Sequence, residues 1–219
     1  MATVGTLKTR VLYDLSDISQ NNYVDAEIWI QFNKGLNFIS KELAKFDSKV
    51  GVDNTTLTIA ASGNSASLNA AFLNFVVNEK SEPKVFNATN DYSQMTQAKE
   101  SDVDLWEQED STDTGTPSEF YLRGLTFYVH PWADVETTVK YHYHPIKTIT
   151  NDASTMPWDG LFDEAVAHFV VLALRTRDER LNMVQMDSFL FDVLKRDVMD
   201  ILFKREGFTM NFADGAGWN

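Results

Sequence analysis

The sequence predicts an α+β fold: a mainly α-helical bundle of about four helices, a small antiparallel β subdomain inserted into it, and an extended C-terminal tail. Apolar residues recur at helical spacing near both ends of the chain, whereas the middle alternates between apolar and polar residues and is punctuated by glycine and proline. With 219 residues, 43% of them hydrophobic, the chain can bury a substantial core. We interpret 1–219 as a single domain, with 1–50 and 155–206 as the helical bundle and 51–150 as the β subdomain.

The segment 161–176 is apolar almost all the way round, which is typical of a helix buried on several sides. Asp159 can cap its start, and Arg175 and Arg177 lie at its end, where positive charge opposes the helix dipole. The sequence therefore predicts a central helix. His168 lies within it, and we expect a hydrogen-bonded core histidine there rather than a general base.

Two helices are predicted before this central helix, at 3–15 and 25–46. Thr3 is the expected cap of the first. In the second, apolar residues recur at steps of three and four. Trp29 lies off that stripe, so it either extends the core or faces a partner subunit.

A fourth helix is predicted at 181–205, with Met183, Met186, Leu190, Val193, Leu194 and Ile201 on one face. On an ideal helical wheel, Asp197 falls inside this apolar face. A carboxylate in such a place needs a cation, with Arg175 or Arg177 as candidates, or else a place at a subunit boundary.

Short strands are predicted in the β subdomain around 56–60 and 74–78, with a hairpin at 120–130 and a third antiparallel strand at 137–143. Between these two parts, the segment 100–114 carries seven acidic residues and no Lys or Arg. We expect an exposed acidic loop or the end of a helix there, anchored by Leu105 and Trp106.

The segment 207–219 contains several glycines, which disfavour regular structure. It also carries four large apolar residues, Phe208, Met210, Phe212 and Trp218. Such side chains dominate the energetics of protein interfaces. The composition therefore predicts an extended docking tail.

No catalytic motif stands out, and the chain is not predicted to be an enzyme or to need a cofactor or a metal. The absence of cysteine excludes disulfides and thiolate metal sites. The best set of metal ligands is His142 and His144 on one strand with His130 on a neighbouring strand, but no acidic residue is spaced to complete it. We interpret these histidines as part of a polar sheet face.

The net charge of −13 disfavours wrapping of nucleic acid, since phosphate affinity comes from clusters of Lys and Arg. It is compatible with a passage through which DNA slides. We identify no secretion signal and no apolar run of about 20 residues that could span a bilayer.

Several short motifs follow one another in a fixed order: Tyr23-Val-Asp-Ala-Glu-Ile, Phe32-Asn-Lys-Gly-Leu, Pro117-Ser-Glu-Phe-Tyr-Leu-Arg-Gly, Thr126-Phe-Tyr-Val-His-Pro-Trp-Ala-Asp, Tyr141-His-Tyr-His-Pro, and Met156-Pro-Trp before Leu161-Phe-Asp-Glu-Ala-Val. In order and spacing they resemble the head-to-tail connector or adaptor proteins of tailed bacteriophages. The resemblance spans most of the chain.

The resemblance implies a structural virion protein at the neck between head and tail, made and assembled in the host cytoplasm. About a dozen copies (a dodecamer) would form a ring on the portal protein, extend the DNA channel without sequence-specific DNA binding, and present a docking platform for tail or nozzle proteins. It also implies that the C-terminal tail docks on the portal or on a neighbouring subunit.

Two alternative functions come from other classes. One is a muralytic enzyme that hydrolyses cell-wall glycan, with Glu107 and Glu109 as the carboxylate pair. The other is a glycan-binding tail component that uses Trp132 and Tyr141 as platforms.

Overall fold

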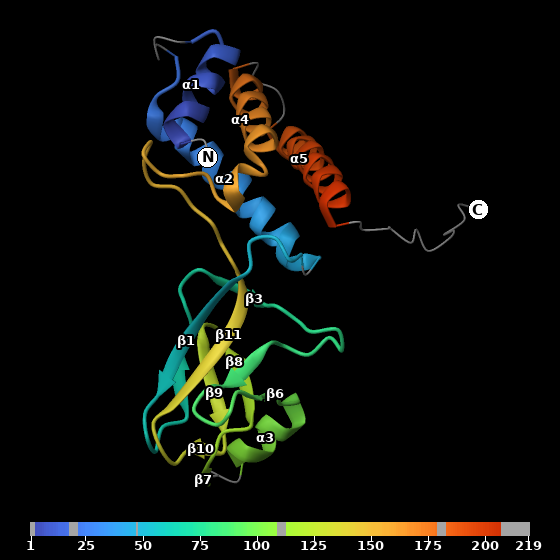
Figure 1. The fold of residues 1–219 in the computed structure, drawn as a ribbon. Coiled ribbons are helices and arrows are strands. Elements are labelled where there is room, and N and C mark those ends of the chain that lie inside the picture. Colours follow the sequence, from blue (N-terminus) through green and yellow to red (C-terminus); the bar gives the residue numbers. More distant parts are fainter. Residues whose placement is uncertain (1–2, 18–21, 47, 109–112, 179–182, 207–219) are drawn as a thin grey trace, which may run out of the picture. The chain divides into compact units, whose positions relative to one another are not determined.

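The computed structural model describes residues 3–17, 22–46, 48–108, 113–178 and 183–206. The fold is α+β, and the described residues form five α-helices and several sheets (Figure 1). The chain divides into two compact units: unit 1 comprises Met1–Ile39 and Thr148–Asn219, and unit 2 comprises Ser40–Lys147. The β portion is therefore substantial, and the expectation of a small insert was wrong.

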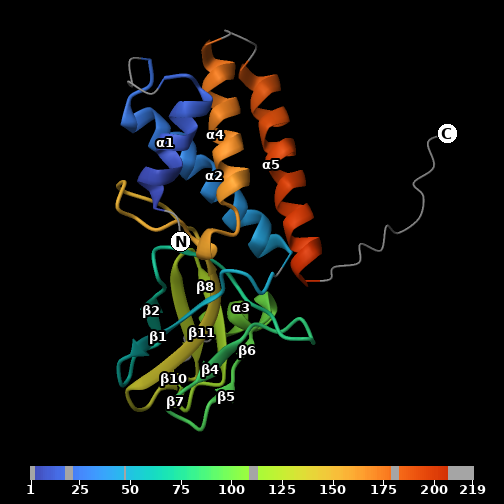
Figure 2. The ribbon, with the colours of Figure 1, turned by 45° about the horizontal axis from the view of Figure 1, so that its top comes forward.

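Four of the five helices match the predicted ones: α1 (Val4–Asp14), α2 (Asp25–Lys45), α4 (Asp163–Asp178) and α5 (Met183–Glu206). The end of α2, beyond Ile39, belongs to unit 2. Helices α4 and α5 run side by side in both views (Figures 1 and 2). Thr3 caps α1 as predicted, since its hydroxyl accepts a hydrogen bond from the Thr6 amide.

The predicted apolar stripe of α2 is confirmed, because Ile28, Phe32, Leu36, Ile39 and Leu43 are all buried. Next to this stripe, Gly35 allows a close approach to α4. A Cβ atom at this position would lie 3.2 Å from a ring carbon of Phe169. The missing side chain thus lets the two helices pack closely at this point.

The start of α4 differs from the prediction. A short 3₁₀ turn, Trp158–Gly160, precedes the helix, and Asp159 lies within this turn with a positive φ of 56°. The helix itself begins at Asp163. Asp159 therefore belongs to the connection before α4 and is not its cap, because the chain must turn sharply before it can enter the helix.

The buried face of α5 consists of Leu190, Leu194, Val198 and Leu202, which recur every four residues. Val193 and Ile201 are half-buried at its margin, so the predicted face is rotated slightly. The side chains of Met183 and Met186 lie outside the described part of the chain. Beside this face, the Phe191 ring lies 4.9 Å from that of Phe38 and 5.4 Å from that of Phe169, which joins α5 to α2 and α4.

Unit 2 holds two larger sheets and a short parallel pair. One sheet contains β1 (Asp53–Ile59), β11 (Thr137–Pro145), β4 (Val85–Asn87) and β5 (Ser93–Gln94), with β3 (Phe72–Phe75) also paired to β11. The second contains β2 (Ser65–Ser67), β9 (Thr126–His130), β8 (Glu119–Arg123) and β6 (Thr96–Gln97). The pair is β7 (Thr114–Gly115) with β10 (Trp132–Ala133).

The predicted hairpin is β8 and β9, which pair antiparallel across a turn where Gly124 has a φ of +60°. The predicted third strand, β11, is antiparallel but belongs to the other sheet, where it pairs along its length with β1. The inward faces of the two larger sheets share one aromatic core. Its largest members are Phe75, Phe120, Phe127, Tyr141 and Tyr143.

Of the two alternatives for the acidic segment, a loop or the end of a helix, the structure has a helix, α3 (Glu100–Gln108). Acidic residues in the first turn favour a helix because they oppose the positive end of its dipole. The anchors also differ in part. Val103 is buried, Leu105 is exposed, and the Trp106 ring stacks on that of His130 with centroids 4.0 Å apart.

No helix within the described residues is both long enough and apolar enough to cross a membrane.

Candidate functional site

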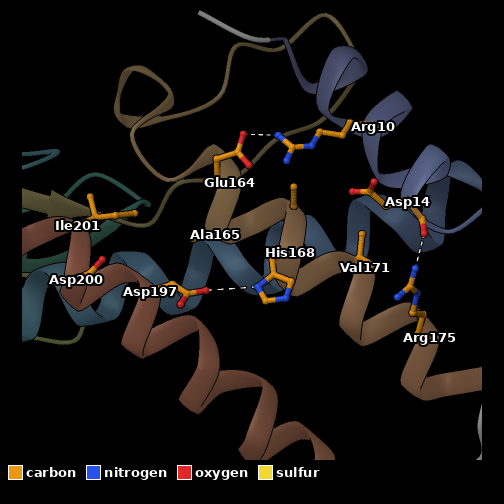
Figure 3. Close-up of a pocket in the computed structure, with 11 residues that line it drawn as sticks. Arg10, Asp14, Glu164, Ala165, His168, Val171, Arg175, Asp197, Asp200 and Ile201 are labelled. Carbon is orange, nitrogen blue, oxygen red and sulfur yellow. Dashed lines mark hydrogen bonds and ion pairs between the residues drawn. The ribbon is translucent and has the colours of Figure 1, made fainter.

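A charged groove of about 580 Å³ lies between three helices of unit 1 (Figure 3). Its walls come from α1 (Arg10, Asp14), α4 (Glu164, Ala165, Ala167, His168, Val171, Arg175) and α5 (Asp197, Asp200, Ile201). Four of these side chains are carboxylates, facing two arginines and one histidine. The groove is therefore acidic on balance, but positive groups are interleaved with the acids.

The Arg10 guanidinium donates a hydrogen bond to the Glu164 carboxylate, and this contact joins α1 to the first turn of α4 (Figure 3). The same hydrogen bond holds the pKa of Glu164 below its usual range, against the smaller opposing effect of burial. Both side chains are largely exposed to solvent. The pair therefore aligns two helices and adds little stability.

At the other end of the groove, the Arg175 guanidinium donates a hydrogen bond to the backbone carbonyl of Asp14. Asp14 is the last residue of α1, where unsatisfied carbonyl groups carry partial negative charge. A cation is favourable at this position. Arg175 thus caps α1 from a helix distant in the sequence.

His168 and Asp197 face each other across the middle of the groove, with 3.5 Å between Nδ1 of the histidine and Oδ2 of the carboxylate. They connect α4 to α5. The His168 side chain is 53% exposed, so the expectation of a buried core histidine was wrong. This contact is an ion pair only when the imidazole is protonated.

The partners of Asp197 differ from those predicted. Among the described residues, its carboxylate lies near His168 and, at 3.8 Å, near the Nε of Arg196. Arg175 instead caps α1. The side chain of Arg177 lies outside the described part of the chain. The carboxylate sits beside the buried face of α5 rather than within it, which is why exposed groups can reach it.

A second polar cluster in unit 1 surrounds Lys8, whose side chain is 9% exposed. Its ammonium group lies 3.1 Å from the Asp25 carboxylate and also contacts that of Asp152. Burial alone would lower the pKa of Lys8, but the hydrogen bonds to Asp152 and Asp25 outweigh it and raise the pKa. Trp29 is half-buried and belongs to this cluster, since its indole N–H donates to Asp152 at 3.1 Å.

The three histidines considered as metal ligands differ in their surroundings. His142 projects from the outer face of β11, His144 is buried, and His130 stacks on Trp106 beside the other sheet. Among the described residues, no group of three or more His, Asp or Glu side chains is arranged to hold a metal ion.

Of the residues considered for glycan chemistry, the structure describes the side chains of Trp132 and Tyr141. Tyr141 is 1% exposed, and its hydroxyl accepts a hydrogen bond from the Asn69 amide, so it cannot serve as a platform. Trp132 is half-buried in the short strand β10. Glu109 and the side chain of Glu107 lie outside the described residues.

The four apolar residues of the predicted docking tail, Phe208, Met210, Phe212 and Trp218, also lie outside the described residues. Sequence reasoning missed Arg10 and Glu164 as groove residues. Their pairing joins positions 154 residues apart, and no local pattern signals such a contact. The only available hint was that α4 carries charged residues at Glu164, His168 and Arg175, spaced along one side of a helix.

The sequence matches no family model, and no curated protein is significantly similar to it.

Proposed function

We propose that this chain is a structural protein of a tailed-bacteriophage virion, a subunit of the head-to-tail adaptor ring. The observation that carries the proposal is the order of the connector-like motifs along the chain. The structure is compatible with it, since three of these motifs come directly before or at the start of a helix or a hairpin. Tyr23-Val-Asp leads into α2, the motif at Pro117 opens the β8–β9 hairpin, and Met156-Pro-Trp leads into α4.

In this proposal, α1, α2, α4 and α5 form a helical bundle, and the segment 207–219 is an extended tail. The tail docks on the portal protein or a neighbouring subunit through Phe208, Met210, Phe212 and Trp218. The ring holds about a dozen copies at the neck, extends the DNA channel and receives tail or nozzle proteins. The chain acts without catalysis or cofactor.

The charged groove is the proposed contact between subunits, with Arg175 and Asp197 as interface residues. Arg177 and Trp29 are further interface candidates that are not among its described lining residues. The groove is open, and its carboxylates and cations are interleaved. A surface of this kind favours a partner with the complementary pattern and excludes one of uniform charge. The overall charge of −13 also suits a DNA channel, because acidic walls repel phosphate within a Debye length of about 8–10 Å.

The test is assembly on a portal protein, observed by negative-stain imaging and mass photometry. The full chain should form rings when portal is added, and a chain ending at Glu206 should keep its melting temperature but fail to bind portal. The double variant Phe208→Ser, Phe212→Ser keeps the full length of the tail, so it is the matched control that separates loss of the aromatic side chains from loss of length. Unchanged portal affinity of the truncated chain would remove the role of the tail. Absence of any ring or portal complex from the full chain would overturn the proposal itself.

A further inference from the structure

The outer face of the five-stranded sheet in unit 2 is basic, in contrast to the acidic chain as a whole. Side chains alternate between the two faces of a strand. On β11, Val139 and Tyr141 point into the core, so Lys140 and His142 lie on the outer face. On the neighbouring strand β4, Val85 is buried and Phe86 is outside.

An open groove of about 600 Å³ adjoins this face, and three lysines contribute to its lining: Lys49, Lys80 and Lys84. Lys84 immediately precedes β4, so it connects the groove to the outer face of the sheet. We define the basic face as these lysines together with Lys140, His142 and two aromatic rings, Phe86 and Tyr92.

The lysines of the basic face are available to a ligand. Within the part of the chain that the structure describes, no ion pair joins any of them to a carboxylate. Two acids also line the groove, Glu79 and Glu82. The Glu82 carboxylate is occupied, since it accepts hydrogen bonds from the side-chain amides of Asn78 at 3.0 Å and Gln94 at 3.4 Å. Both carboxylates keep their charge, so the three lysines and two acids of the groove leave a small net positive charge there, to which Lys140 adds.

The positive charge of the neighbouring lysines affects the pKa of His142. Its pKa lies below the ordinary value of histidine, first because the ring is partly buried and then because Lys140 and Lys84 repel a further positive charge. Lys140 on β11 and Lys84 just before β4 therefore both lie close enough to His142 to lower its pKa. An anion bound there would relieve their mutual repulsion.

Aromatic rings are interleaved with these charges. Tyr92 is 60% exposed, and the Lys140 ammonium lies 5.9 Å from the centre of its ring. Phe86 meets the His142 ring edge to face, with centroids 6.2 Å apart. Rings on an open sheet surface can stack on unpaired bases, while neighbouring lysines contact the phosphates.

We propose that the basic face binds single-stranded nucleic acid, with the phosphates on Lys84 and Lys140 and a base on Tyr92. An acidic protein segment would use the lysines but would leave the exposed ring without a stacking partner. A duplex would likewise offer phosphates but no open base. Binding of this kind is independent of base sequence, because lysines that contact phosphates and a ring that stacks on a base do not read base edges. The inference does not depend on the ring-forming function.

The experiment is fluorescence anisotropy of the full chain with a labelled 20-nucleotide single strand, over a range of salt concentrations. Replacing both Lys84 and Lys140 by Gln should weaken binding at least tenfold and reduce the slope of log K against log salt by about 1.4, since each single-strand phosphate contact contributes about 0.7. The matched control replaces Lys34 and Lys99, which are exposed elsewhere, and should leave the slope unchanged.

Tyr92→Ala should weaken single-strand binding by about tenfold, since stacking contributes on that order for each base. Tyr13→Ala, at a more exposed tyrosine of unit 1, is its control and should have no effect. Circular dichroism and melting curves confirm that each variant is folded. Ring formation on portal is measured in parallel, so that loss of nucleic-acid binding with normal assembly separates this inference from the proposed function.

Three outcomes would overturn the inference. One is no detectable binding at 50 mM salt. Another is equal affinity for a duplex of the same length, which would show that stacking on Tyr92 does not contribute to binding. The third is equally effective competition by an acidic peptide or by inorganic polyphosphate at the same charge concentration.

Discussion

Two clusters of charged groups, one in each unit of this chain, are used differently. In unit 1, three cations are engaged: Lys8 lies between two carboxylates, Arg10 contacts Glu164, and Arg175 caps α1. In unit 2, Lys147 is paired with Asp53, but Lys84 and Lys140 both act on His142 and form no ion pair with a carboxylate among the described residues. Paired charges position helices, whereas unpaired charges of one sign raise the local potential and attract a ligand. The comparison distinguishes charged groups that contact other groups of the fold from charged groups that are available to bind a ligand.

The largest effect should come from Lys8→Met. This change leaves the carboxylates of Asp25 and Asp152 without their cation in a partly buried site. Breaking a fully buried pair costs about 3–5 kcal/mol, and because these carboxylates are partly exposed we expect about 2–3 kcal/mol of lost unfolding free energy. Urea denaturation measures it.

The control for Lys8→Met is Lys34→Met, at an exposed position on α2. The matching change in unit 2 is Lys140→Met, which should leave stability within about 0.5 kcal/mol of wild type, since no ion pair is broken. If Lys8→Met were no more damaging than these two, the contrast between the units would not hold.

A smaller effect is expected for Asp197→Leu. The His168 contact is half-exposed, so its loss should change the unfolding free energy by less than about 1 kcal/mol, in either direction. If the groove joins subunits as proposed, the same variant should fail to form rings on portal. Asp192→Leu, at an exposed position on α5, is the control. Normal assembly of the Asp197 variant, together with a loss of several kcal/mol in the monomer, would contradict both expectations.

His142 should give stability a dependence on pH. Its folded pKa lies below the unfolded value of about 6.5, so the unfolded chain binds more protons as the pH falls. The contribution of His142 is therefore fully present above pH 6.5 and is lost as the pH falls below it toward the folded pKa. His142→Gln should flatten this part of the stability profile.

The pKa of His142 can also be measured directly by NMR titration, and Lys140→Met should raise it. A pKa that does not respond to removal of Lys140 would show that the lysines do not act on this point of the sheet.

The smallest effect should come from Arg10→Gln. It removes a surface pair, so we expect a change of about 0.5 kcal/mol or less, with a rise in the pKa of Glu164 once its hydrogen bond is gone. Thermal melting and NMR titration of Glu164 measure the two effects. A loss as large as that of Lys8→Met would mean that exposure is a poor guide to the energetics of this groove.

The long helices were predictable from the sequence because their burial repeats along the chain. The stripe through Ile28, Phe32 and Leu36 shows the 3.6-residue period directly, and it is buried as expected. The short strands β4, β5 and β6 have two or three residues each, too few for a period to be visible. Their pairing depends on partners elsewhere in the sequence.

The sites were less predictable than the helices. The apolar composition of α4 suggested burial all round, but a groove opens along one side and exposes His168. The partner of Asp197 depends on how α4 and α5 pack against each other, and a helical wheel drawn for one helix carries no information about that packing. On the basic face, the alternation of Lys140 and His142 with buried tyrosines was visible in the sequence. That Lys84 lies beside His142 could be seen only once the pairing of β4 with β11 was known.

The discontinuity of unit 1 has a consequence for synthesis on the ribosome. Lys8 meets Asp152 across 144 residues, and Arg10 meets Glu164 across 154. These contacts cannot form until α4 has left the exit tunnel, whereas unit 2 is one continuous segment and can fold as soon as Lys147 has emerged. Since domains generally fold as units during translation, α1 and α2 must wait with apolar faces uncovered. We therefore expect the apolar residues of α1 and of the first part of α2 to be more exposed during synthesis than in the finished protein.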